Sequence, residues 1–171
     1  MSFKELLKQV ESNDLFKEFK KKHPKAKLYS AFFTLRKAHG NILLDSQQLD
    51  YVIGKKEVFS FFMQNNEVQS KEDKLNKEVK DFKELDKNIK IDIEEVKKII
   101  LKEKQKQKIS TDFTEMVIIL QKLKGKQIWN TLMVLPSLEI LRIHIGMDGK
   151  ILSSKREGFM NFIKVKKGKK K

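Results

Sequence analysis

The sequence predicts an α+β fold in which helices cover one face of an antiparallel sheet. Two stretches, Phe3–Lys22 and Asp92–Gln107, repeat apolar residues at the spacing of an amphipathic helix. Each is followed by runs rich in β-branched and aromatic residues, which are typical of strands. The order helix, three strands, charged segment, helix, three strands predicts a duplicated helix-plus-three-stranded meander. Joined edge to edge, the halves would form one continuous six-stranded sheet with the helices on one face and two fewer exposed strand edges.

Residues 1–64 form the first predicted unit. In its helix, Ser12-Asn13-Asp14 can interrupt or restart the helical pattern, because these residue types favour helix caps. His23-Pro24 ends the helix, since the residue before proline is pushed out of the α region. We expect His23 to interact with the carbonyl groups at the C-terminal end of the helix rather than to bind a metal. The predicted strands are Leu28–Arg36, Gln47–Ile53 and Glu57–Gln64, with a polar loop over Ala38–Ser46 and a turn at Gly54-Lys55-Lys56.

Aromatic residues crowd the strands of this first unit. Alternation places Tyr29, Ala31, Phe33 and Leu35 on one face of the first strand, and Leu28 and Phe32 on the other. This aromatic cluster could resemble a platform on which nucleic-acid bases stack. Aromatic residues on strands beside an apolar helix are more typical of a hydrophobic core, which is the preferred interpretation. The residues expected in this core are Phe32, Phe33, Tyr51, Phe59, Phe61 and Phe62.

Residues 65–90 are predicted to form a charged, partly helical linker, because lysines and acids alternate around widely spaced apolar residues. Residues 91–154 form the second unit. Its helix has Asp92 as a plausible N-cap and Glu95 three residues later, which is the spacing of a capping box. Its strands are predicted at Phe113–Leu123, Ile128–Leu135 and Leu141–Ile145, with the apolar pair Ile151-Leu152 after a turn.

The stretch Gln127–Leu152 is the most apolar of the chain. Alternation places Trp129 and Asn130 on opposite faces of one strand, where we expect a core tryptophan beside a hydrogen-bonded amide. After Pro136-Ser137, Leu141, Ile143 and Ile145 fall on one face of the next strand. Arg142 and His144 fall on the other face and are candidates for an exposed sheet surface.

The second half resembles a PepSY-type module, a small cystatin-like unit of one helix and a meander. The resemblance is carried by the helix I-D-I-E-E-V-K-K-I-I (Ile91–Ile100) and by the ending I-H-I-G-M-D-G-K-I-L (Ile143–Leu152). Gly149-Lys150-Ile151-Leu152 fits the family's ending, whereas Gly146 stands where the family usually has an aspartate. The resemblance implies a binding or inhibitory appendage and brings no catalytic residues with it.

Composition limits the classes of function. The chain has 171 residues, no cysteine and a formal net charge of +15, so disulfides and cysteine-bound zinc are excluded. No apolar run approaches the roughly 18–20 residues of a membrane span. The charged N-terminus lacks the apolar segment of a signal peptide, so we expect a cytoplasmic protein. Residues 155–171 carry eight Lys or Arg and one Glu, a net charge of +7, and this basic tail is expected to be disordered from about residue 164.

The sequence contains little catalytic chemistry. The histidines His23, His39 and His144 lack metal-binding spacing, and no glycine-rich phosphate loop or serine nucleophile motif occurs. Asp45, Asp50 and Asp148 lie near predicted strand ends, where an acid could act with His39 or His144, but turn chemistry is the preferred interpretation. The sequence therefore predicts a protein that is not an enzyme and needs no metal or cofactor.

Three hypotheses of function follow. The first is a non-catalytic binding or regulatory module for a protein or peptide, which could add a strand to a free sheet edge. The second is binding of a polyanion such as nucleic acid through the basic tail. The candidate contacts in that tail are Lys164, Lys166, Lys167, Lys169, Lys170 and Lys171. The third is a small ligand held in a concave sheet lined by Trp129, Tyr51 and the phenylalanines; oligomeric state does not follow from the sequence.

Overall fold

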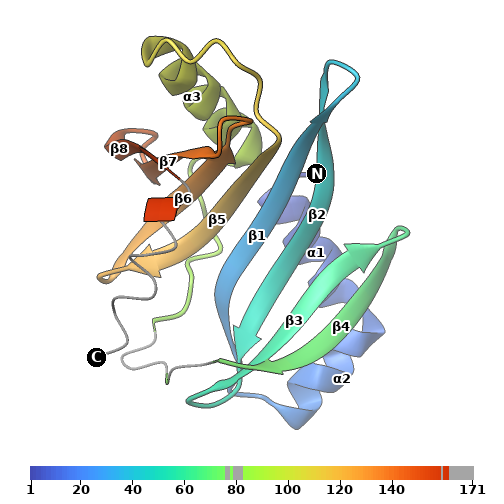
Figure 1. Cartoon of the computed structure of the whole chain (residues 1–171). Helices are drawn as coiled ribbons and strands as arrows, with labels where there is room; N and C mark the ends of the chain where they lie inside the picture. Colours follow the sequence, from blue (N-terminus) through green and yellow to red (C-terminus); the bar gives the residue numbers. More distant parts are fainter. Residues whose placement is uncertain (76–77, 79–82, 159, 162–171) are drawn as a thin grey trace.

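The computed structural model describes residues 1–75, 78, 83–158 and 160–161, which form one antiparallel sheet with helices on one face (Figure 1). The sheet has eight strands in the order β4-β3-β2-β1-β5-β6-β7-β8. Each half of the chain contributes four consecutive strands, and the halves join where β1 pairs with β5. The prediction of an α+β fold with an antiparallel sheet is confirmed. The expected six strands and three-stranded meanders are wrong in number.

The helices and strands have the following bounds. The helices are α1 (Phe3–Ser12), α2 (Asp14–Lys22) and α3 (Ile93–Lys106). The strands of the first half are β1 (Lys27–Ala38), β2 (Asn41–Val52), β3 (Glu57–Gln64) and β4 (Glu67–Lys74). The strands of the second half are β5 (Glu115–Leu123), β6 (Lys126–Val134), β7 (Glu139–Gly146) and β8 (Ile151–Gly158).

The helices begin at side chains that satisfy their free backbone N–H groups. Asp92 caps α3, and Glu95 completes the predicted capping box. Ser2 and Glu5 form the same arrangement at the start of α1. Asn13 ends α1 and caps α2, with its side chain accepting a hydrogen bond from the Leu15 N–H at 2.9 Å. The predicted interruption of the first helical stretch is therefore confirmed.

One hydrophobic core lies between the helices and one face of the sheet. All three helices contribute to it, through residues such as Leu6, Phe19 and Ile100. In Figure 1, α1 and α2 lie behind β1–β4. Trp129 on β6 is fully buried, and its Nε1 donates a hydrogen bond to the Ile91 carbonyl oxygen at 3.3 Å. The prediction of a core tryptophan is confirmed.

Strands occupy three segments that the sequence predicted as loop, linker or tail. The loop predicted over Ala38–Ser46 is wrong, because β2 begins at Asn41 and the turn is confined to His39 and Gly40, which both have positive φ. The linker predicted over residues 65–90 contains β4, which pairs with β3 along its whole length. The tail predicted from residue 155 begins inside β8. The expected linker helix falls largely outside the described residues.

At the start of β1, the faces on which the side chains lie also differ from the prediction. The pairing of β1 with β2 shifts between Leu28 and Ser30. Such a bulge adds one residue to a strand and so reverses which face the preceding side chain meets. Leu28 is therefore fully buried in the core, whereas Tyr29 is half-buried. The expected placement of Leu28 beside Phe32 is wrong.

Candidate functional site on the open face of the sheet

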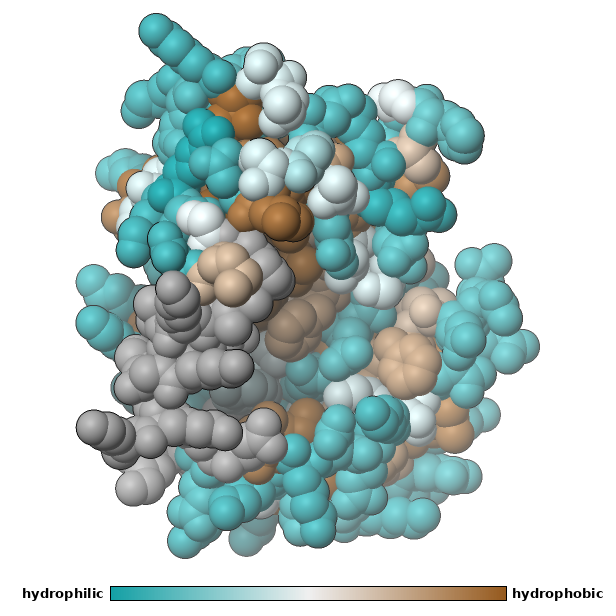
Figure 2. Space-filling view, in the orientation of Figure 1, coloured by the Kyte–Doolittle hydropathy of each residue, from teal (hydrophilic) through white to brown (hydrophobic). Residues whose placement is uncertain are grey.

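The surface of the sheet opposite α1, α2 and α3, here called the open face, is covered by none of these three helices. Side chains alternate between the two faces of a sheet along each strand, so the residues of the open face are the sequence neighbours of core residues. Strand pairing aligns seven of them in a row that crosses the sheet from β4 to β7. The row consists of Gln69, Phe62, Gln48, Phe32, Ile119, Asn130 and His144, all half-buried. Figure 2 views this side of β1–β4 and shows hydrophobic residues gathered mid-face among hydrophilic ones.

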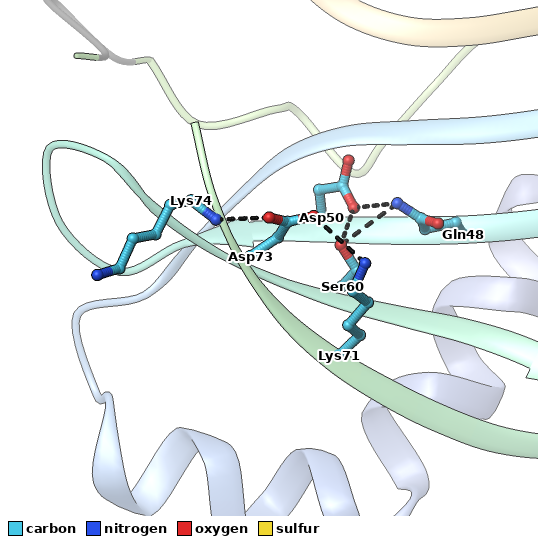
Figure 3. Close-up of polar contacts among 6 residues, drawn as sticks. All are labelled: Gln48, Asp50, Ser60, Lys71, Asp73 and Lys74. Carbon is cyan, nitrogen blue, oxygen red and sulfur yellow. Dashed lines mark hydrogen bonds and ion pairs between the residues drawn. The ribbon is translucent and has the colours of Figure 1, made fainter. Parts of the chain in front are cut away.

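A buried carboxylate lies beside this row. Asp50 on β2 is 7% exposed and sits between Ser30 on β1, 2% exposed, and Ser60 on β3, 8% exposed. Its Oδ2 accepts a hydrogen bond from Ser30 Oγ at 3.0 Å. Its Oδ1 accepts hydrogen bonds from Ser60 Oγ at 2.7 Å and from Gln48 Nε2 at 2.6 Å (Figure 3). Three neutral donors therefore hold one carboxylate in the open face.

Cations around the open face are paired with acids. Lys71 on β4 lies beside Ser60, and its ammonium is 3.5 Å from the Asp73 carboxylate (Figure 3). Arg36 pairs with Asp45 at 2.8 Å on the hairpin of β1 and β2. At the other side of the sheet, Arg142 lies 2.9 Å from Glu157, and Lys155 lies 3.5 Å from the same carboxylate. These described cations are thus largely neutralised locally.

The Asn130 side chain presents a second hydrogen-bond acceptor. Its Oδ1 is buried and has no hydrogen-bond partner. The expectation of a hydrogen-bonded amide beside the tryptophan is therefore wrong. A buried polar atom without a partner is uncommon and costs about 1–3 kcal/mol, so Asn130 Oδ1 is a candidate acceptor for a donor group of a partner.

Arg142 and His144, the predicted exposed residues of the sheet, do lie on the open face, and both are half-buried. Burial lowers the pKa of His144, and the positive charge of Arg142 lowers it further. His144 therefore stays neutral to lower pH than an exposed histidine does. It lies opposite Asn130 in the pairing of β6 with β7.

The acids and histidines that the sequence singled out are not brought together. Asp50 is bonded to serines and Gln48, Asp45 pairs with Arg36, and the Asp148 side chain accepts a hydrogen bond from the Lys150 N–H at 3.1 Å. His23 ends α2, and its ring packs 5.3 Å from the ring of Phe19. None of the described residues forms a group of three or more metal-binding side chains.

The aromatic residues divide between the two faces. Phe33, Tyr51 and Phe61 are buried in the core, and Phe59 is partly buried against it. The prediction that Phe32 and Phe62 belong to the core is wrong, because both lie half-buried on the open face. Trp129 and Tyr51 face the helices, so they do not line a ligand cavity on the open face. The Tyr51 hydroxyl donates to Glu11 at 3.3 Å, and burial, with Glu11 beside it, raises the pKa of Tyr51.

A groove of about 560 Å³ lies on the helix side, where α1 ends and the turn between β3 and β4 approaches it. Its lining is mixed, with amide and hydroxyl groups beside apolar side chains. The lining residues are Gln9, Ser12, Asn13, Leu15, Met63, Asn66, Glu67 and Val68. It brings no reactive pair of side chains together.

The serines that hold Asp50, Ser30 and Ser60, are not among the site residues that the sequence predicted. A signal for them was present, because Ser30 and Ser60 each interrupt a strand that is otherwise rich in aromatic residues. The predicted tail contacts, from Lys164 to Lys171, lie outside the described residues. Within the described chain, no helix has the length and apolar character that a membrane crossing requires.

The sequence matches no protein-family model and no curated protein. The fold is similar to the crystal structure of a candidate lipoprotein from Clostridium difficile 630, with a TM-score of 0.53. The two sequences are 16% identical, and the match covers 87% of this chain and 94% of that chain. At this identity the likeness shows a shared fold and nothing about activity.

Proposed function

We propose that the protein is a non-catalytic binding module that holds an extended peptide segment of a protein partner on the open face. The observation that carries this proposal is the half-buried row containing Phe62, Phe32 and Ile119 on a sheet whose helices α1, α2 and α3 all pack on the other face. Apolar surface removed from water contributes roughly 25 cal/mol per Å². Apolar patches rimmed by polar groups are typical of interaction sites.

The face supports this role better than the sheet edges do. The edge strands are β4 and β8; β4 is charged along most of its length, and β8 is charged over Lys155–Glu157. Charged edge strands are a common means of preventing further strand addition. An extended peptide that lies across the open face would instead meet apolar rings and amide groups. The name of the Clostridium difficile neighbour specifies no ligand, so the proposal takes only the fold from it.

The test is selection of phage-displayed random heptapeptides on the full chain, followed by affinity measurement with the selected peptides. Ile119→Lys places a charge in the middle of the row and should abolish binding. Leu15→Lys makes the same kind of change at an apolar residue on α2 that is 44% exposed, and should leave binding unchanged. Phe62→Lys gives a second position nearer the sheet edge. Peptides that bind all three variants equally would overturn the proposal.

Binding of a polyanion by the basic tail is the second proposed function. It is supported by the net charge of +7 on residues 155–171. Because the described cations of the open face are paired with acids, this activity is assigned to Lys164–Lys171 and not to the open face. Charge-driven binding of nucleic acid falls steeply with salt.

A further inference from the structure

The open face holds a buried carboxylate, although the chain as a whole is strongly basic. The chain carries a net charge of +15, yet the carboxylate of Asp50 is bonded to three neutral donors and to no described cation. An ionised carboxylate only accepts hydrogen bonds, and it is costly to bury without a counter-charge. The nearest cation by strand pairing is Lys71, and its ammonium forms an ion pair with Asp73. Asp50 is therefore a carboxylate of the open face with no cation partner among the described residues.

A second acceptor lies farther along the same row. Gln48, which binds Asp50, is followed across the sheet by Phe32, Ile119 and Asn130. Three strand spacings separate Gln48 from Asn130, which is about 14 Å, the length of four or five extended residues. The unpartnered Oδ1 of Asn130 needs a donor, and a peptide backbone N–H can supply one. Asp50, beside Gln48, and Asn130 thus present acceptors, and the apolar side chains of Phe32 and Ile119 lie between them.

We propose that the peptide bound on the open face is cationic, with a lysine or arginine side chain above Asp50 and apolar side chains on Phe32 and Ile119. This inference rests on the proposed function and specifies the chemistry of the partner. A charge-assisted hydrogen bond is about twice as strong as a neutral one. The buried carboxylate therefore favours a cation, and the paired rim charges offer little attraction for an acidic segment. The bound segment is therefore expected to be cationic, although the net charge of the chain would suggest a polyanion partner.

The heptapeptide selection tests this inference through the composition of the peptides. Lysine or arginine flanked by apolar residues should be enriched on the wild-type chain. Replacing that cation with norleucine should weaken binding about tenfold or more, the range of one charge-assisted hydrogen bond. Asp50→Asn should remove this difference between the two peptides. Asp45→Asn, the same change at a residue paired with Arg36 on the exposed hairpin, should preserve it.

The outcomes separate the two proposals. Peptides that bind the wild type, lose binding to Ile119→Lys and show no preference for a cation would overturn only the inference. Enrichment of acidic peptides would also overturn it. The norleucine comparison uses the wild-type chain, so it stands even if Asp50→Asn fails to fold. A dimer in analytical ultracentrifugation that Ile119→Lys converts to monomer would show a second copy on the face and would overturn both proposals.

Discussion

Asp92 joins the N-terminal ends of two helices: its Oδ1 accepts a hydrogen bond at 2.8 Å from the backbone N–H of Phe3, which lies 89 residues earlier in the chain. The same oxygen accepts one from the Ile93 N–H at 2.7 Å. Phe3 begins α1, and Asp92 caps α3. Helix N-termini carry partial positive charge, so one carboxylate stabilises both. The helices of the two halves are thus fixed to each other by a side chain as well as by the core.

We expect Asp92→Ala to lower the free energy of unfolding by about 2 kcal/mol, because the loss of an N-cap side chain alone costs about 0.5–2 kcal/mol. Urea unfolding followed by circular dichroism measures the change. Glu94→Ala is the matched control, since Glu94 lies exposed in the same turn and makes only an ion pair with Lys97. Its effect should stay within about 0.5 kcal/mol. Equal losses in the two variants would show that Asp92 does not link the helices.

Glu103 provides a pH-dependent contact between α3 and β8. Its carboxylate accepts hydrogen bonds from Gln107 Nε2 and from Ser154 Oγ, both at 2.8 Å. These bonds lower the pKa of Glu103 below its ordinary value of 4.5, and the bond from Gln107 has the larger effect. The unfolded chain therefore takes up the proton first as the pH falls. The stability that Glu103 contributes is complete above about pH 4.5 and is lost as the pH falls through its folded-state pKa.

Glu103→Gln should consequently flatten the loss of stability below pH 4.5. Chemical unfolding at a series of pH values measures this slope. Glu18→Gln changes an exposed glutamate on α2 and serves as the control. If both variants lose stability with acid as steeply as the wild type does, the hydrogen bonds to Glu103 contribute nothing to acid stability.

The sequence predicted the strands that bury the side chains of one face and leave those of the other face more exposed. In β7, Leu141, Ile143 and Ile145 are fully buried, whereas Arg142 and His144 are not, and this alternation is legible without a structure. It predicted edge strands poorly. In β4, Val68 is the residue buried in the core, and the remaining positions are polar or charged, so the strand has no apolar period to detect. The segment forms a strand because it pairs with β3, and its composition alone does not indicate this.

The candidate site could be predicted only in part. Alternation correctly separated Phe32 from Phe33, but it did not show that α1, α2 and α3 all leave the Phe32 face uncovered. That fact depends on these three helices packing on one side, which is a property of the tertiary structure. The meeting of Ser30, Asp50 and Ser60 depends on the register of three strands. Single-strand patterns contain no information about such cross-strand alignment.

His144 should titrate below the ordinary histidine pKa of 6.5, because burial and the charge of Arg142 both disfavour its cation. The unfolded chain is protonated first, so this contribution to stability is present above pH 6.5 and is lost as the pH falls through the folded-state pKa. NMR titration of the imidazole carbon-bound protons measures the midpoint. Arg142→Gln should raise the midpoint only partway, since burial is the larger cause. A wild-type midpoint at or above 6.5 would contradict the placement of His144.

Removal of residues 164–171 tests polyanion binding separately from the open face. The deletion removes six lysines. Each phosphate contact contributes about 0.9 to the slope of log affinity against log salt for duplex DNA, so the slope should fall by up to about five. A full-length chain with these lysines replaced by glutamine is the matched control, and it should behave like the deletion if charge is the cause. Titration of a fluorescent DNA duplex at several salt concentrations gives the slope. An unchanged slope in both chains would assign any affinity for DNA to lysines elsewhere, because the tail would then contribute no phosphate contacts.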